Sequence, residues 1–152
     1  MPKFNPEYVL KLKETVRTSP YPSHMHMTLD EIGPDTADIG LEINPCHFQP
    51  FGIVHGGVLA TLIDTATFWA AFLNLPQDCG LVNVDLKLNY LAPVTQGRLL
   101  ARGKCIKAGR TLSYTEASVF GPDGELITHG TSTLMSLPGK GLDLGVAKFL
   151  EA

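Results

Sequence analysis

The stretch that most constrains the fold is a long apolar run that follows a histidine and two glycines. It covers residues 55–73 and reads HGGVLATLIDTATFWAAFL. A helix on a protein surface carries a charged face, whereas a helix that is apolar almost all round is buried. One acidic side chain, Asp64, interrupts the run about two turns after its start. Because an isolated carboxylate is costly to bury, the sequence predicts a buried central helix with an acid that needs a specific explanation.

The composition is that of a globular protein. The chain has 152 residues, of which 44% are hydrophobic and 18% charged, so we expect a single domain over residues 1–152 with a substantial core. The formal net charge of −3 comes with no polybasic cluster, and we therefore expect no nucleic-acid partner.

Cysteine usage and the N-terminal sequence indicate a cytoplasmic protein. The three cysteines are odd in number and show no close ligand spacing, which predicts reduced and mostly buried thiols. Charged residues interrupt any apolar segment near the N-terminus, so no signal peptide is expected. The apolar run at 57–73 is short of the ~20 residues that span a bilayer and contains Asp64, so we expect no membrane segment.

The remaining chain predicts a short helix and a series of antiparallel strands. Asn5 is expected to cap an amphipathic helix over residues 5–18, with an extended linker at 19–22. Strands are expected at 24–32, 36–44, 81–91, 97–107, 111–120 and 125–137, and a last helical turn near 146–150 in the tail, 139–152. In the strand at 81–91, one face is expected to carry Val82, Val84, Leu86, Leu88 and Tyr90.

These elements predict an α+β fold in which a curved antiparallel sheet wraps around one long central helix. A helix this apolar needs cover on most of its sides, and a curved sheet provides it. A second molecule can cover the part that remains exposed.

The helix also has the geometry of a reactive site. At 100° per residue, the helix places Gly57, Thr61, Asp64 and Phe68 on one stripe, away from the apolar arc. The free N–H groups at the helix start can hold an anion or a developing oxyanion. Asp64 lies roughly 10 Å further along, so a thioester could meet both groups if one came from a neighbouring subunit. On spacing alone a structural role stays open, with the glycines as a tight turn and Asp64 bound to a partner helix.

The motif H-G-G-x-x-x-x-L-x-D-x-A, from His55 through Asp64 to Ala66, resembles that of the hotdog-fold acyl-CoA thioesterases. The nearest type is the phenylacetate-pathway and thioesterase-superfamily-member-2 group. The order of expected elements is also similar, over residues 5–137. The resemblance implies a hotdog fold and hydrolysis of an acyl-CoA by a dimer or a dimer of dimers.

The resemblance also implies roles for four residues around the start of the helix. Asp64 would be the general base for water, or the nucleophile, at the thioester carbonyl. The Gly56 N–H would polarise that carbonyl, and His55 would fix the loop and contact the thioester end of the substrate. Gln49 would orient the water or the thioester across the dimer interface.

Further residues are expected at the substrate on the same basis. Asn83 stands where some relatives have serine or threonine, and it is the point at which this chain departs from them. Arg110 and Thr111 resemble a segment that touches CoA phosphates, which suits the bidentate contacts of arginine. The remaining candidates for substrate contact are Gly57, Thr61, Phe51 and Phe68.

No metal or redox cofactor is expected, since CoA is part of the substrate and product. His24 and His26 share one strand face but lack a third ligand. Two alternatives remain open: a hotdog enoyl-CoA hydratase or dehydratase, and a protein that binds acyl-CoA without turning it over.

Overall fold

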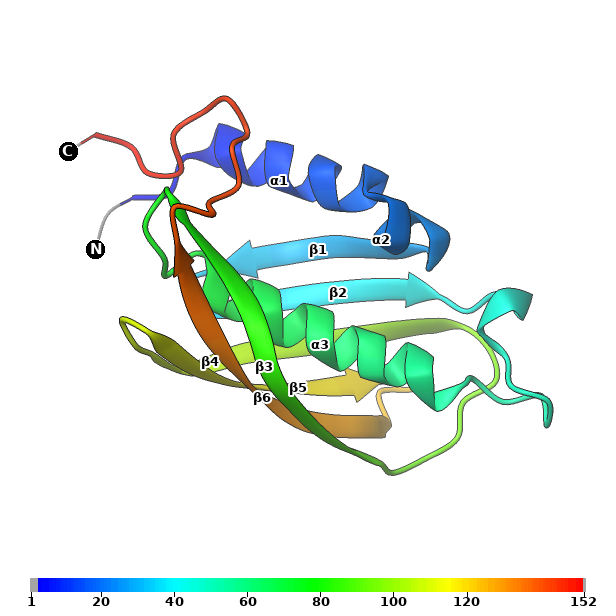
Figure 1. Ribbon diagram of the computed structural model, residues 1–152. Helices are drawn as coiled ribbons and strands as arrows, with labels where there is room; N and C mark the ends of the chain where they lie inside the picture. Colours follow the sequence, from blue (N-terminus) through cyan, green and yellow to red (C-terminus); the bar gives the residue numbers. More distant parts are fainter. Residues whose placement is uncertain (1–2, 152) are drawn as a thin grey trace.

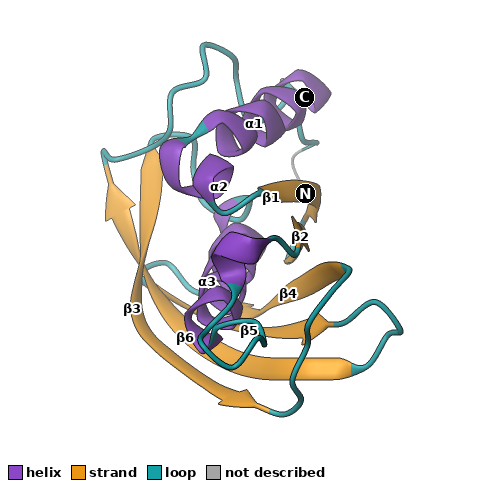
Figure 2. Ribbon diagram, turned by 90° about the vertical axis from the view of Figure 1, so that its right-hand side faces the viewer, coloured by secondary structure: helices purple, strands orange, loops and turns teal. Residues whose placement is uncertain are grey.

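The computed structural model describes residues 3–151, which form one six-stranded antiparallel sheet curled around a central helix (Figures 1 and 2). The sheet has the strand order β1-β2-β4-β5-β6-β3. Its strands are β1 (Met27–Gly33), β2 (Thr36–Glu42), β3 (Cys79–Tyr90), β4 (Arg98–Ala108), β5 (Leu112–Phe120) and β6 (Leu126–Pro138). The helices are α1 (Pro6–Thr18), α2 (Pro20–His24), α3 (Gly56–Phe72) and a 3-10 turn, η1 (Pro45–His47). This is the predicted hotdog architecture.

Helix α3 lies in the hollow of the sheet, as its apolar sequence predicts (Figure 2). Its most deeply buried side chains form the middle of the core and include Leu62, Ile63, Ala66 and Ala70. The contact with β4 is so close that a Cβ on Gly103 would lie 2.1 Å from the carbonyl oxygen of Ala66. The helix is therefore seated directly on the backbone of the sheet, which fixes the position of every side chain along it.

The N-terminal helix begins where it was predicted, but the segment after it has a different conformation from the predicted one. The Asn5 side chain accepts a hydrogen bond of 3.0 Å from the Glu7 N–H and so caps α1. Residues 19–22 were expected to be extended; Ser19 is extended, but residues 20–22 lie in α2, with Pro20 in its first turn. Proline lacks an N–H that a first helical turn leaves unpaired, so it starts this helix as readily as it ends the previous one. Strand β1 consequently begins at Met27, after residues 24–26 have completed the turn.

A β-bulge in β3 changes the predicted face of that strand. The register with β6 shifts between Asn83 and Asp85, so the alternation of side chains is interrupted at Val84. Val82 and Val84 are 40% and 51% exposed, so they do not share a face with the partly buried Leu86 and Leu88 as predicted, and Asn83 turns towards α3 instead. The period-two pattern was correct on each side of the bulge but not across it.

The C-terminal tail closes the far end of α3. No helical turn forms at residues 146–150, because the backbone there pairs with the N-terminal segment: Asn5 donates to the Lys148 carbonyl at 3.0 Å, and Phe4 and Phe149 form a β-bridge. The fully buried Lys148 ammonium donates to the carbonyl oxygens of Phe72 and Leu75 at 2.6 and 2.8 Å. Burial lowers the pKa of Lys148 to about 8. The tail thus supplies the hydrogen bonds that the end of α3 lacks.

All three cysteines are free; Cys79 and Cys105 are buried and Cys46 is exposed. Within residues 3–151, no helix is both long and apolar enough to cross a membrane.

Candidate active site

A buried histidine positions the loop that leads into α3. His47 is 1% exposed, and its Nδ1 accepts a hydrogen bond of 2.9 Å from the Asn44 N–H. The proton is therefore assigned to Nε2, which lies 2.9 Å from the Met25 carbonyl oxygen. The His47 carbonyl in turn accepts from the His55 N–H at 2.8 Å. Sequence reasoning found no partner for His47, since these groups meet only in the folded chain.

His55 determines which N–H at the start of α3 stays free. Its Nδ1 accepts a hydrogen bond of 2.7 Å from the Gly57 N–H, so this ring is the N-cap of the helix. The Val58 N–H is used by the His55 carbonyl at 2.9 Å. The Gly56 N–H has no acceptor among residues 3–151. It is the open donor at the positive end of the helix.

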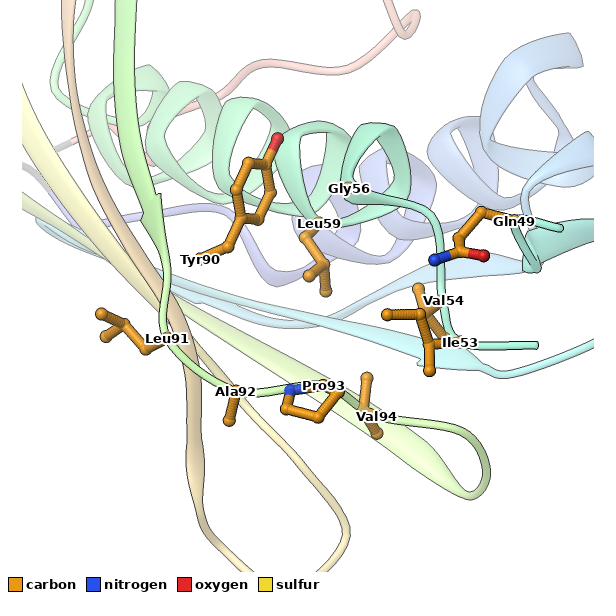
Figure 3. A pocket seen from close by; sticks show the side chains of 10 residues that line it. All are labelled: Gln49, Ile53, Val54, Gly56, Leu59, Tyr90, Leu91, Ala92, Pro93 and Val94. Carbon is orange, nitrogen blue, oxygen red and sulfur yellow. The ribbon is translucent and has the colours of Figure 1, made fainter. Parts of the chain in front are cut away.

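A pocket of about 420 Å³ lies beside Gly56 (Figure 3). Its polar lining groups come from Gln49, Gly56 and Tyr90. The Gln49 side-chain oxygen accepts from the Phe51 N–H, which leaves the amide N–H groups of Gln49 free to donate. The other lining residues are Ile53, Val54, Leu59, Leu91, Ala92, Pro93 and Val94. None of the lining side chains is charged, so the pocket combines hydrogen-bond donors with apolar walls.

Asp64 lies in a different depression, of about 300 Å³, together with Gly57, Thr61 and Tyr21. Three residues of the predicted stripe, Gly57, Thr61 and Asp64, thus line one hollow, whereas Phe68 lies outside it. Asp64 is half-buried, and its carboxylate accepts no hydrogen bond from any residue in the range 3–151. Burial raises the pKa of this carboxyl group. Tyr21 was missed by sequence reasoning because α2 was not predicted; its hydroxyl lies 2.8 Å from the Thr61 hydroxyl.

One chain does not bring Asp64 and Gly56 to the same cavity. The two residues line separate pockets, and they are eight positions apart, which corresponds to roughly 12 Å of helix. A carbonyl group held by the Gly56 N–H is thus out of reach of the Asp64 carboxylate of the same molecule.

Asn83 is held in a hydrogen-bond network behind α3. Its amide nitrogen donates to the Ser132 hydroxyl at 3.0 Å and lies 3.5 Å from the Thr67 hydroxyl. The Ser132 hydroxyl donates in turn to the Asp85 carbonyl at 2.7 Å. Because Thr67 lies one turn beyond Asp64, Asn83 is near the acid but already has protein partners.

The remaining predicted site residues lie outside the two pockets. Phe51 is 90% exposed on the loop before α3, and Phe68 packs against Trp69 with ring centroids 4.9 Å apart. Arg110 and Thr111 are exposed on the β4–β5 hairpin, at the opposite end of the sheet from the start of α3 (Figure 1). Within one chain they do not contact Gly56 or Asp64.

Comparison with known proteins identifies the family. The model of the thioesterase superfamily matches residues 51–128, slightly more than half of the chain, including the start of α3 and Asp64. A thioesterase family protein from Silicibacter pomeroyi is 28% identical and superposes with a TM-score of 0.80, covering 87% of this chain and 99% of that one. A thioesterase from Haemophilus influenzae is 26% identical, with a TM-score of 0.78 and coverages of 84% and 88%. The chain belongs to the thioesterase superfamily, whose members hydrolyse thioesters.

We predict that the fold loses stability below about pH 6.5 because of His47. Burial lowers the pKa of His47 from its ordinary value of 6.5, so below that pH the unfolded chain binds more protons than the folded chain. Protonation of His47 at Nδ1 also breaks the hydrogen bond that this atom accepts from the Asn44 N–H. The free energy of unfolding, measured in urea from pH 8 to pH 5, should fall by up to ~1.4 kcal/mol per pH unit from this group.

The variant His47→Gln should be less stable at pH 7 and show a shallower decline. His24→Gln, at an exposed histidine, is the control, and its free energy of unfolding should decline with pH as in the wild type. If the free energy of unfolding of His47→Gln falls with pH as steeply as that of the wild type, His47 is not the cause of the decline.

Proposed function

We propose that the protein hydrolyses an acyl-CoA thioester to the free acid and CoA. The observation that carries the proposal is the Asp64 carboxylate, which is half-buried and receives no hydrogen bond within residues 3–151. A group this costly to bury is typical of a functional site, and the family supplies thioester hydrolysis as the reaction.

In the proposed reaction, the Gly56 N–H binds the thioester carbonyl oxygen and stabilises the negative charge that develops on it. Asp64 removes a proton from a water molecule whose oxygen attacks the carbonyl carbon, and the CoA thiolate leaves when the tetrahedral intermediate collapses. Direct attack by the carboxylate, followed by hydrolysis of the anhydride, uses the same residues. The raised pKa of Asp64 makes it a stronger base than an exposed aspartate.

The site is proposed to form between two chains, with Gly56 and Gln49 from one and Asp64 from the other. The separation of the two pockets within one chain supports this arrangement. So does β3, which is an edge strand with the exposed side chains of Val82 and Val84 along it. An unpaired apolar edge is a ready surface for pairing with a second copy.

The acyl group is proposed to occupy the uncharged pocket beside Gly56. The side chains of Arg110 and Thr111 are proposed to contact the CoA phosphates from the hairpin of a neighbouring chain. The reaction as written requires no metal and no redox cofactor.

The first test replaces Asp64 by asparagine. We expect Asp64→Asn to lower kcat by about a thousandfold, the order of magnitude that a general base contributes, while CoA binding is kept. The melting temperature should not fall, because the buried, ionised carboxylate destabilises the folded protein and asparagine removes that charge. In the wild type, the acidic limb of kcat/KM should lie above pH 3.8, the ordinary pKa of an aspartate.

Asp38→Asn is the matched control, since burial also raises the pKa of Asp38 but this residue lies on β2, outside both pockets. Its activity should equal that of the wild type. Full activity of Asp64→Asn would contradict the proposal. Hydration of an enoyl-CoA by the wild type would favour the alternative that the protein is a hydratase.

The second test asks whether the site is shared. Gly56→Pro removes the N–H donor at a position whose backbone conformation accepts proline, because the preceding His55 has φ −61° and ψ 136° and Gly56 is the first helical residue. The proline Cβ also displaces the Tyr90 ring of the same chain, so the variant disables this end of the site completely. We expect Gly56→Pro and Asp64→Asn each to be inactive alone. After unfolding and refolding together, mixed dimers contain one intact site, so about a quarter of the wild-type activity should return.

Each variant refolded by itself is the control and should stay inactive. A mixture that stays inactive would place both groups in one chain and contradict the shared site.

The third test concerns the charge of the acyl group. Because none of the side chains that line the pocket is charged, a free carboxylate on the acyl chain would be buried without a partner. We expect kcat/KM for butyryl-CoA and phenylacetyl-CoA to exceed that for succinyl-CoA by about tenfold or more, measured by release of the CoA thiol. Equal values for the neutral and acidic substrates would show that the acyl group lies elsewhere.

A further inference from the structure

Tyr90, the last residue of β3, reaches across to the first turn of α3. An ideal Cβ on Gly56 would lie 3.0 Å from Cζ of Tyr90 and 3.1 Å from its hydroxyl oxygen. Figure 3 shows the phenol pointing towards helix α3. The Tyr90 hydroxyl group is therefore a direct neighbour of Gly56, the residue whose N–H is free.

Packing alone does not account for this side chain. Tyr90 is 57% exposed, and its hydroxyl has no hydrogen-bond partner in the described chain. The hydroxyl of Tyr21, by contrast, is paired with Thr61. A phenol needs no hydroxyl to wall an apolar pocket, and here the hydroxyl is placed where the pocket holds its other donors.

We propose that the Tyr90 hydroxyl donates a hydrogen bond to the thioester carbonyl oxygen that the Gly56 N–H also binds. This inference rests on the proposed function. Two donors at one oxygen share the charge that develops as the carbonyl becomes an oxyanion, and no bond to Tyr90 forms or breaks. Tyr90 is then a catalytic residue, since it touches the reacting group.

The same contact gives a second reason for glycine at position 56. Any side chain there would displace the phenol, because its Cβ would be closer to Cζ of Tyr90 than real Cβ atoms usually approach. Gly56 thus keeps the helix start accessible and leaves room for the second donor.

The test is Tyr90→Phe, which keeps the ring and removes only the oxygen. We expect kcat to fall by about 10- to 100-fold, with KM changed by less than about twofold, because the hydrogen bond strengthens in the transition state. The melting temperature should stay that of the wild type. Tyr114→Phe is the matched control: Tyr114 is 47% exposed on β5, outside both pockets, and its loss of a hydroxyl should leave kcat unchanged.

Tyr90→Leu separates the ring from the hydroxyl and should raise KM in addition to lowering kcat. If Tyr90→Phe retains the wild-type kcat while Asp64→Asn has lost it, the proposed function stands and the role of Tyr90 is overturned. If neither variant loses activity, or the wild type hydrolyses no acyl-CoA, both proposals are overturned.

Discussion

Burial of the apolar helix α3 is the constraint on which the rest of the structure depends. The sheet must curl to cover it, and at Gly103 the covering strand has no side chain, so helix and sheet touch through their backbones. A cover this close leaves little freedom for the helix to slide or turn. Asp64 faces a hollow on one side of the helix, and the start of the helix carries the Gly56 N–H, which has no acceptor within residues 3–151. The groups proposed to react thus lie on parts of the helix that its packing leaves accessible.

Local hydrogen bonds then select a single donor from the several that a helix start offers. His55 takes the Gly57 N–H through its ring and the Val58 N–H through its carbonyl, so the positive end of the dipole is directed to one remaining group. The ring of His55 must accept at Nδ1 for this to hold, which leaves its Nε2–H directed away from the cap. His47, one hydrogen bond further back, ties the same point to Met25, in the turn between α2 and β1.

The architecture could be predicted from the sequence because the patterns that indicate it are local. The apolar run of α3, the alternation in the strands and the cap at Asn5 all follow from neighbouring residues. It failed where the outcome depends on partners distant in the chain. The bulge at Val84 is set by pairing with β6, the tail is held by the N-terminal segment, and Pro20 starts a helix instead of a linker. The motif singles out Asp64 and Gly56 as candidates, and their catalytic roles stay predictions. The pairing of His47 and the position of Tyr90 over Gly56 could not, since each joins residues that only the fold brings together.

The tail that closes α3 also has a consequence for how the chain folds during synthesis. The Lys148 ammonium satisfies the Phe72 carbonyl from 76 positions further along the chain. While a ribosome adds those residues, strands β3 to β6 emerge but the end of the helix still lacks its partner. The end of the helix can therefore gain these two hydrogen bonds only after Lys148 has left the ribosome, later than any strand of the sheet.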